Sequence, residues 1–287
     1  MDPDVVADIP CTVGEAPLWH PDEDALYWTD DHEGRLYRFD PEDGAHKCVY
    51  NGIPFGGFTF QDDGTFLLFL EDGRIENWDH RDESAETIVE ELPQYRGSRF
   101  NDVIADPEGR VFCGMKPSDT HPGCLYRLDT DGTIRKVVDD LGLPNGMGFT
   151  PDHDGFYLTD SDARVIWKYS YDRASGEIYE PEPFVRTSVA RGIPDGMKVD
   201  TNGHVWSARW NDGRVYRYTP EGAEARRIEF PVWKVSSLTI GGPQYTDAYA
   251  TTAGGDDREH EGQYAGSLFR FSINVNGVPE FRSGIQL

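Results

Sequence analysis

The chain has 287 residues, of which 37% are hydrophobic and 13% aromatic, so it can bury a large core and does not belong to the disordered class. Asp and Glu number 52 against 27 Lys and Arg, and a net charge of −25 disfavours nucleic-acid and anionic-membrane partners. No stretch approaches the roughly 20 apolar residues of a membrane span, and the acidic start MDPDVVADIP does not resemble a signal peptide. We therefore expect a soluble, cytoplasmic protein.

The carboxylates are spread along the whole chain and Lys is scarce, which favours a salt-adapted cytoplasm over an ordinary acidic enzyme. At about 1 M salt the screening length falls to about 3 Å, so repulsion between like charges is largely removed. The four cysteines, Cys11, Cys48, Cys113 and Cys124, form no CxxC pair, and we expect free thiols.

Three kinds of strand-like segment recur six times in chain order. The openings are apolar runs at 16–19, 57–60, 102–106, 146–150, 196–200 and 237–240. Second runs follow at 26–30, 66–70, 111–115, 156–160, 205–209 and 248–252. Third runs, which alternate apolar and polar residues as in LYRFD and LYRLD, lie at 36–40, 75–79, 125–129, 166–170, 215–219 and 268–272.

These runs, with a weaker fourth strand and no helical stretch, predict an all-β fold, a six-bladed β-propeller that forms one domain over residues 1–287. A barrel or two sandwiches would not explain sixfold recurrence. We expect a strand around residues 5–13 to join the last blade and close the ring.

The openings differ from one another in their polar residues. Because the innermost strands of a propeller line its channel, their first residues converge on its mouth, and four openings place Glu15, Asn101, Asn145 and Asp195 there. Such oxygen ligands predict one divalent cation, with Ca²⁺, Mg²⁺, Mn²⁺, Fe²⁺ and Zn²⁺ all open. An Asn-Gly or Asp-Gly pair is usually a hairpin turn. Here, however, Asn145-Gly146 and Asp195-Gly196 each follow an apolar residue and Pro and precede Met.

Several other chemistries lack their motifs. The eight histidines show no HxH or HExxH spacing, which argues against a three-His zinc site. The absence of GxSxG, GxGxxG and Walker patterns argues against serine nucleophiles and nucleotide binding.

The segments RFNDVIADPEGRVFCG (99–114), LPNGMGFTPD (143–152) and IPDGMKVDTNGHVW (193–206) resemble the regucalcin/gluconolactonase (senescence marker protein) family, and the resemblance covers essentially the whole chain. It implies a sugar lactonase that opens aldonolactones. It also implies that Glu15, Asn145 and Asp195 hold one divalent metal and that Arg99 and Asn101 bind substrate.

The chain departs from the family in one region. Gly114-Met115-Lys116 stands where family members often read G-T-M, and the family's acidic substrate contact falls near Asp119, in the loop 117–122.

The resulting hypothesis is metal-dependent hydrolysis in which Asp195 is both a metal ligand and the residue that orients or deprotonates water. Phe58, Trp19 or Trp210 are candidates to shape the sugar pocket. We expect a small sugar lactone as partner, with xylono- or arabinonolactone of pentose degradation preferred over gluconolactone, and a monomer or weak homo-oligomer. The alternatives are an organophosphate or aryl-ester hydrolase on a related propeller, and a non-catalytic calcium-binding propeller or protein scaffold.

Overall fold

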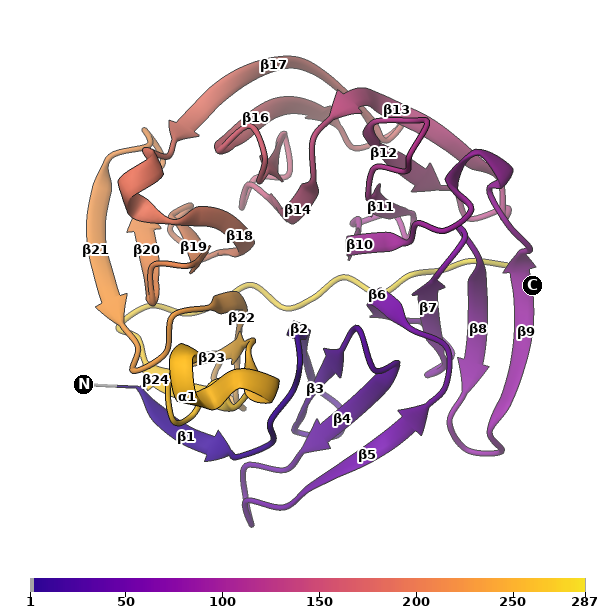
Figure 1. Cartoon of the computed structure of the whole chain (residues 1–287). Coiled ribbons are helices and arrows are strands. Elements are labelled where there is room, and N and C mark those ends of the chain that lie inside the picture. The colour runs from indigo at the N-terminus through magenta and orange to yellow at the C-terminus, as the bar shows by residue number, and fades with distance from the viewer. Residues whose placement is uncertain (1–2, 287) are drawn as a thin grey trace.

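The computed structural model describes residues 3–286, which form six antiparallel sheets of four strands arranged in a ring (Figure 1). Each sheet is one blade, and its strands run outward from the central channel. The predicted six-bladed β-propeller is confirmed.

The first three blades comprise β2 (Gly14–His20), β3 (Ala25–Asp30), β4 (Arg35–Phe39) and β5 (His46–Asn51); β6 (Phe55–Phe60), β7 (Phe66–Leu70), β8 (Ile75–Asp79) and β9 (Ser84–Val89); and β10 (Phe100–Ala105), β11 (Val111–Met115), β12 (Gly123–Leu128) and β13 (Ile134–Leu141). The last three comprise β14 (Pro144–Phe149), β15 (Gly155–Asp160), β16 (Val165–Asp172) and β17 (Glu177–Arg186); β18 (Ile193–Val199), β19 (Val205–Trp210), β20 (Arg214–Tyr218) and β21 (Glu224–Glu229); and β22 (Val235–Gly241), β23 (Asp247–Thr252), β24 (Leu268–Ser272) and β1 (Asp4–Ala7).

The ring closes as expected, because β1 pairs antiparallel with β24 as the outer strand of the last blade. The strand is shorter than predicted and ends at Ala7, while Val13 makes only an isolated bridge to Ala253. The expectation of no helix was wrong in detail, since α1 (Arg258–Glu261) and the 3₁₀ turns Pro93–Tyr95, Val189–Arg191 and Gly255–Asp257 lie between strands. No helix in residues 3–286 has the length and apolar character that crossing a membrane requires.

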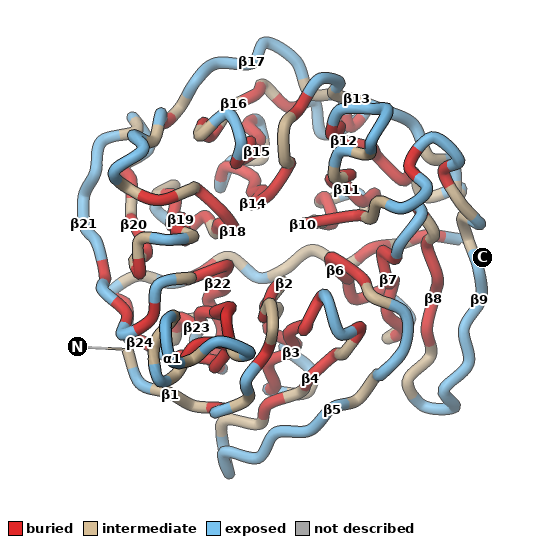
Figure 2. Tube along the Cα trace, viewed as in Figure 1, coloured by how far each residue is buried: buried red, intermediate tan, exposed pale blue. Residues whose placement is uncertain are grey.

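The core lies between blades rather than within them. Each of the six apolar clusters combines residues of two neighbouring blades; for example, Ile166 of β16 packs in one cluster with Val199 of β18. A twisted sheet has two faces to bury, and radial stacking buries both. Figure 2 shows the result, with buried inner strands and exposed outer strands such as β9 and β21.

Residues 273–286, the C-terminal strap, cross the channel after the last blade (Figure 1). Gly277 bridges Asp200, which follows β18, and Ser283 bridges Gln61, which follows β6. Because these contacts lie where the inner strands end, the strap closes the face opposite the strand starts.

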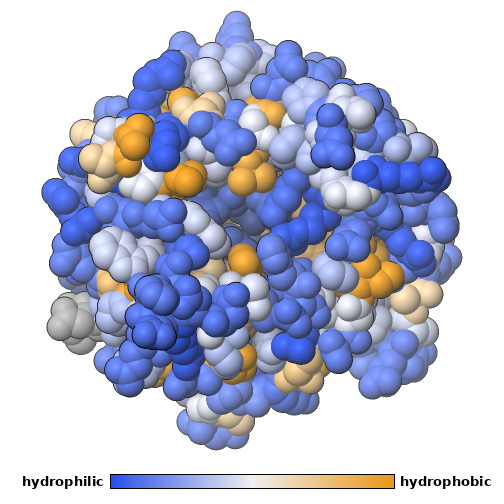
Figure 3. Space-filling view, viewed as in Figure 1, coloured by the Kyte–Doolittle hydropathy of each residue, from blue (hydrophilic) through white to orange (hydrophobic). Residues whose placement is uncertain are grey.

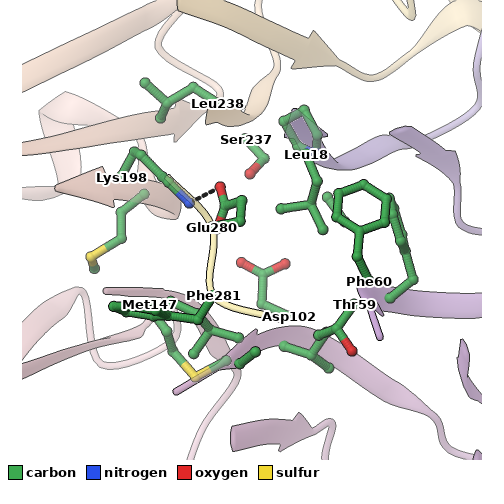
Figure 4. A pocket seen from close by; sticks show the side chains of 17 residues that line it. Leu18, Thr59, Phe60, Asp102, Met147, Lys198, Ser237, Leu238, Glu280 and Phe281 are labelled. Carbon is green, nitrogen blue, oxygen red and sulfur yellow. Dashed lines mark hydrogen bonds and ion pairs between the residues drawn. The ribbon is translucent and has the colours of Figure 1, made fainter. Parts of the chain in front are cut away.

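A small cavity of about 50 Å³ remains above the strap (Figure 4). Lys198 of β18 forms an ion pair there with Glu280 of the strap, and the two side chains are only 12% and 10% exposed. Asp102 of β10 points its carboxylate into the same space.

Candidate functional site at the channel mouth

The first strand of every blade is irregular near its start. The pairing register with the second strand shifts between Glu15 and Leu18, Phe55 and Gly57, Phe100 and Val103, Pro144 and Met147, Pro194 and Met197, and Val235 and Ser237. Such bulges re-aim side chains. The polar residues of the openings lie within the first residues of the inner strands, at these bulges.

Gly146 and Gly196 serve close packing and not a hairpin turn. A Cβ at Gly146 would lie 2.4 Å from the backbone nitrogen of Met197, and one at Gly196 would lie 2.1 Å from Oγ of Ser237. Neighbouring inner strands thus approach one another closely at the point where Asn145 and Asp195 turn toward the axis.

The four predicted polar residues meet around one cavity of about 280 Å³. Glu15, Asn101, Asn145 and Asp195 are each only 5–7% exposed. Figure 3 shows the hollow at the centre of this face, with mainly hydrophilic residues around it. The lining consists of Val13, Glu15, Asp31, His32, Asn101, Lys116, Leu143, Asn145, Ser161, Asp162, Ile193, Asp195 and Trp210.

Hydrogen bonds fix the two amide side chains. Nδ2 of Asn145 donates to Oγ of Ser161 at 3.2 Å, and that hydroxyl donates to the carbonyl of Pro194 at 2.6 Å. Nδ2 of Asn101 donates to the carbonyl of Pro144 at 2.9 Å. The Oδ1 atom of Asn145 is buried and has no hydrogen-bond partner within residues 3–286. A buried acceptor without a partner is costly, so this oxygen is available for a ligand.

The cavity concentrates negative charge. Burial, and then the charges of Asp195, Asp102 and Asp31, raise the pKa of Glu15 well above its usual range. The pKa of Asp195 is also raised well above its usual range, by burial and by Asp102. Burial raises the pKa of Asp102 to about 7, although Lys116 opposes the shift.

Arg99 lies at the edge of this site, one residue before β10. Its Nη2 donates to Oδ2 of Asp31 at 2.5 Å, and its side chain is 11% exposed. Arg99 is not among the cavity-lining residues, whereas its partner Asp31 is. Nη1 of Arg99 and Oδ1 of Asp31 are buried without hydrogen-bond partners among the described residues.

Residues 13–254 match the family described as the SMP-30/Gluconolactonase/LRE-like region. The chain belongs to this family. It is 47% identical to the pentonolactonase XacC of Haloferax volcanii over 289 residues, covering 98% of each chain. It is also 31% identical to a 6-deoxy-6-sulfogluconolactonase of Pseudomonas putida, covering 94% of each chain. Among solved structures, a calcium-binding regucalcin from Agrobacterium tumefaciens has the same fold, with a TM-score of 0.91, 24% identity and coverage of 98% of this chain and 97% of that one.

In this member of the SMP-30/gluconolactonase family, the predicted substrate contact Asp119 lies outside the cavity. Asp119 is exposed in the loop after β11 and does not line the cavity. The aromatic candidates separate as well: Trp210 lines the cavity, Phe58 lines the small cavity deeper in the channel, and Trp19 is buried in the core between blades.

Sequence reasoning missed the residues at the ends of the second strands. Asp31, Lys116 and Ser161 directly follow β3, β11 and β15, and all three line the cavity. An antiparallel second strand ends beside the start of the first, so these residues return to the same mouth. The signal was available, because LYWTD and FYLTD are each followed by a polar residue.

Among residues 3–286, no three His, Cys, Asp or Glu side chains cluster so as to hold a metal by themselves. The candidate set instead combines two carboxylates, Glu15 and Asp195, with the amide of Asn145. Oxygen donors of these two kinds suit a hard divalent cation. The unpartnered Oδ1 of Asn145 fits such an ion.

Proposed function

We propose that this protein is a sugar lactonase that opens aldonolactones with the help of one divalent cation held by Glu15, Asn145 and Asp195. The observation that carries the proposal is the buried, unpartnered Oδ1 of Asn145 in a cavity that it shares with two buried carboxylates. The pentonolactonase of Haloferax volcanii, 47% identical along nearly the whole chain, supports the choice of reaction.

Charge balance supports the cation. Four carboxylates act on one another through their charges, those of Glu15, Asp31, Asp102 and Asp195. The cations that act on them are Lys116 and Lys198, and Arg99 pairs with Asp31. The carboxylates outnumber these cations, and one divalent ion would offset the excess of negative charge. Uncompensated buried charge costs free energy, so a bound cation would stabilise this site.

When bound, the cation would act as a Lewis acid toward the lactone carbonyl and would make water easier to deprotonate. Asp195 is our candidate base: its carboxylate accepts a proton from the attacking water and returns it to the ring oxygen as the carbon–oxygen bond breaks. Arg99 and Asn101 orient the sugar through its hydroxyl groups or ring oxygen. Asp119 takes no part in this proposal because its side chain is exposed away from the cavity.

Within this class we favour pentonolactones, such as xylono- or arabinonolactone, over gluconolactone. The support is the Haloferax volcanii relative, and the net charge of −25 agrees with a salt-adapted protein. Cation identity, oligomeric state and a cytoplasmic location stay predictions.

The test measures acid release from each lactone by the chelator-stripped protein at about 2 M KCl, before and after addition of Ca²⁺, Mg²⁺, Mn²⁺, Fe²⁺ or Zn²⁺. We expect turnover only with a cation, and loss of at least about 100-fold in Asp195→Ala. Full activity in Asp195→Ala, or without any cation, would refute the assignment. Paraoxon-like esters hydrolysed faster than every lactone would favour the organophosphatase alternative, and binding of cation without turnover would favour a binding module.

A further inference from the structure

Lys116 and Arg99 are neighbours across the β10–β11 pair. The backbone N–H of Lys116 donates to the carbonyl of Arg99 at 3.1 Å, directly beyond the paired residues Phe100 and Met115. Like charges opposite each other on adjacent strands repel, and Arg99 adds to burial in lowering the pKa of Lys116. The charges of Asp31, Glu15 and Asp195 act in the opposite direction and favour the charged form of Lys116.

Hydrogen bonds within the protein use only some of the donors of these two side chains. Asp31 accepts from Nη2 of Arg99, while Nη1 remains without a partner. Within residues 3–286, the Lys116 amino group has neither a hydrogen bond nor an ion pair within 4.0 Å. The backbone of Lys116 is held in place by a hydrogen bond, because Oγ of Ser98 donates to the carbonyl of Lys116 at 3.0 Å.

The backbone of Lys116 is thus held in place, whereas its side-chain ammonium group has no partner in the part of the chain that the structure describes and lies in the wall of the cavity. The chain contains only six lysines, and Lys116 is a half-buried one that lies beside an arginine. An ammonium group with free donors in the cavity wall is suited to an anionic oxygen of a ligand.

We propose that Lys116, which lines the cavity in front of the largely buried Arg99, binds the carboxylate that lactone opening creates. This inference rests on the proposed lactonase function and adds a product-binding residue to it. Water adds to the carbonyl carbon, the bond to the ring oxygen breaks, the ring oxygen gains a proton, and the new carboxyl group loses one. A neutral lactone and water therefore give an aldonate anion and a proton. Lys116 attracts the anion much more strongly than the neutral substrate.

The test compares ligands that differ in charge. In the cation-loaded protein, the affinity for xylonate is measured by calorimetry and by product inhibition. The affinity for xylitol and the KM for xylonolactone serve as comparisons with neutral ligands. We expect Lys116→Met to weaken xylonate binding about 10- to 100-fold while KM changes less than about twofold. Lys116→Arg should stay within about threefold of the wild type. Lys136→Met, at an exposed lysine paired with Asp139, is the matched control and should change neither value.

Unchanged xylonate affinity in Lys116→Met would overturn the inference, and so would equal losses for xylonate, xylitol and lactone, which indicate a structural role. If Lys116→Met does not fold, Lys116→Gln removes the charge with a similar side-chain length and is judged by the same criteria. Absence of lactone turnover by the wild type would defeat the proposed function, whereas the xylonate comparison would still decide whether Lys116 binds a carboxylate.

Discussion

Ser161 determines which way the amide of Asn145 points. Its hydroxyl accepts from Nδ2 of Asn145 at 3.2 Å and donates to the carbonyl of Pro194 at 2.6 Å, so it connects the inner strands of two blades. Oδ1 of Asn145 is left without a hydrogen-bond partner within residues 3–286.

Replacement Ser161→Ala should therefore weaken cation binding. Residues that orient metal ligands typically contribute about 10- to 100-fold in affinity, and we expect the lower end of that range. Titration of the stripped protein with cation gives the value. A variant that binds cation as tightly as the wild type would show that Asn145 needs no such support.

The variant Asp119→Asn tests whether Asp119 contacts the substrate, as the sequence predicted, or lies outside the site, as in the structure. Because this carboxylate is exposed outside the cavity, the change should alter the KM for xylonolactone by less than about twofold. A KM increase of about tenfold would restore Asp119 as a substrate contact and imply that its loop folds over the mouth.

The stripped protein should lose stability as pH rises. The pKa of Asp102 is raised in the folded state to about 7, so between about pH 4 and pH 7 the folded protein holds a proton that the unfolded chain has lost. The free energy of unfolding should fall over this range by about 1–3 kcal/mol, and Asp102→Asn should reduce the fall. Denaturation with chelator present, at a series of pH values, measures this; with cation bound, the same curve should be flatter.

Gly196→Ala should destabilise the fold by roughly 1–3 kcal/mol, because the new methyl group would lie 2.1 Å from Oγ and 2.7 Å from Cα of Ser237. Gly284→Ala is the matched control, since its nearest neighbour is the movable carboxylate of Asp62 at 3.3 Å. Equal denaturation midpoints for the two variants would contradict the close approach of these inner strands.

Much of this architecture could be predicted from the sequence, because six repeated strand patterns leave few arrangements that bury both faces of each sheet. The convergence of Glu15, Asn145 and Asp195 followed from the same repeat. The bulges did not, since the apolar pattern of a strand does not show which residue of the neighbouring strand each of its residues pairs with. The strap was also missed, because residues 273–286 occur once and have no counterpart in the other units.

Glu280→Gln should destabilise the protein by about 3–5 kcal/mol, since it leaves the Lys198 ammonium buried without its counter-charge. The double variant Lys198→Met/Glu280→Gln should recover most of the loss, which chemical denaturation of the two single variants and the double variant can measure. Purely additive losses would mean that the two side chains do not depend on each other.

The order in which a ribosome delivers these segments gives the strap a further significance. β1 emerges first but finds its partner β24 only after 260 or so intervening residues, and the strap that seals the channel follows β24. Five blades can stack during synthesis, yet β1 must stay unpaired until β24 has been made, and the axial channel must stay open until residues 273–286 have followed.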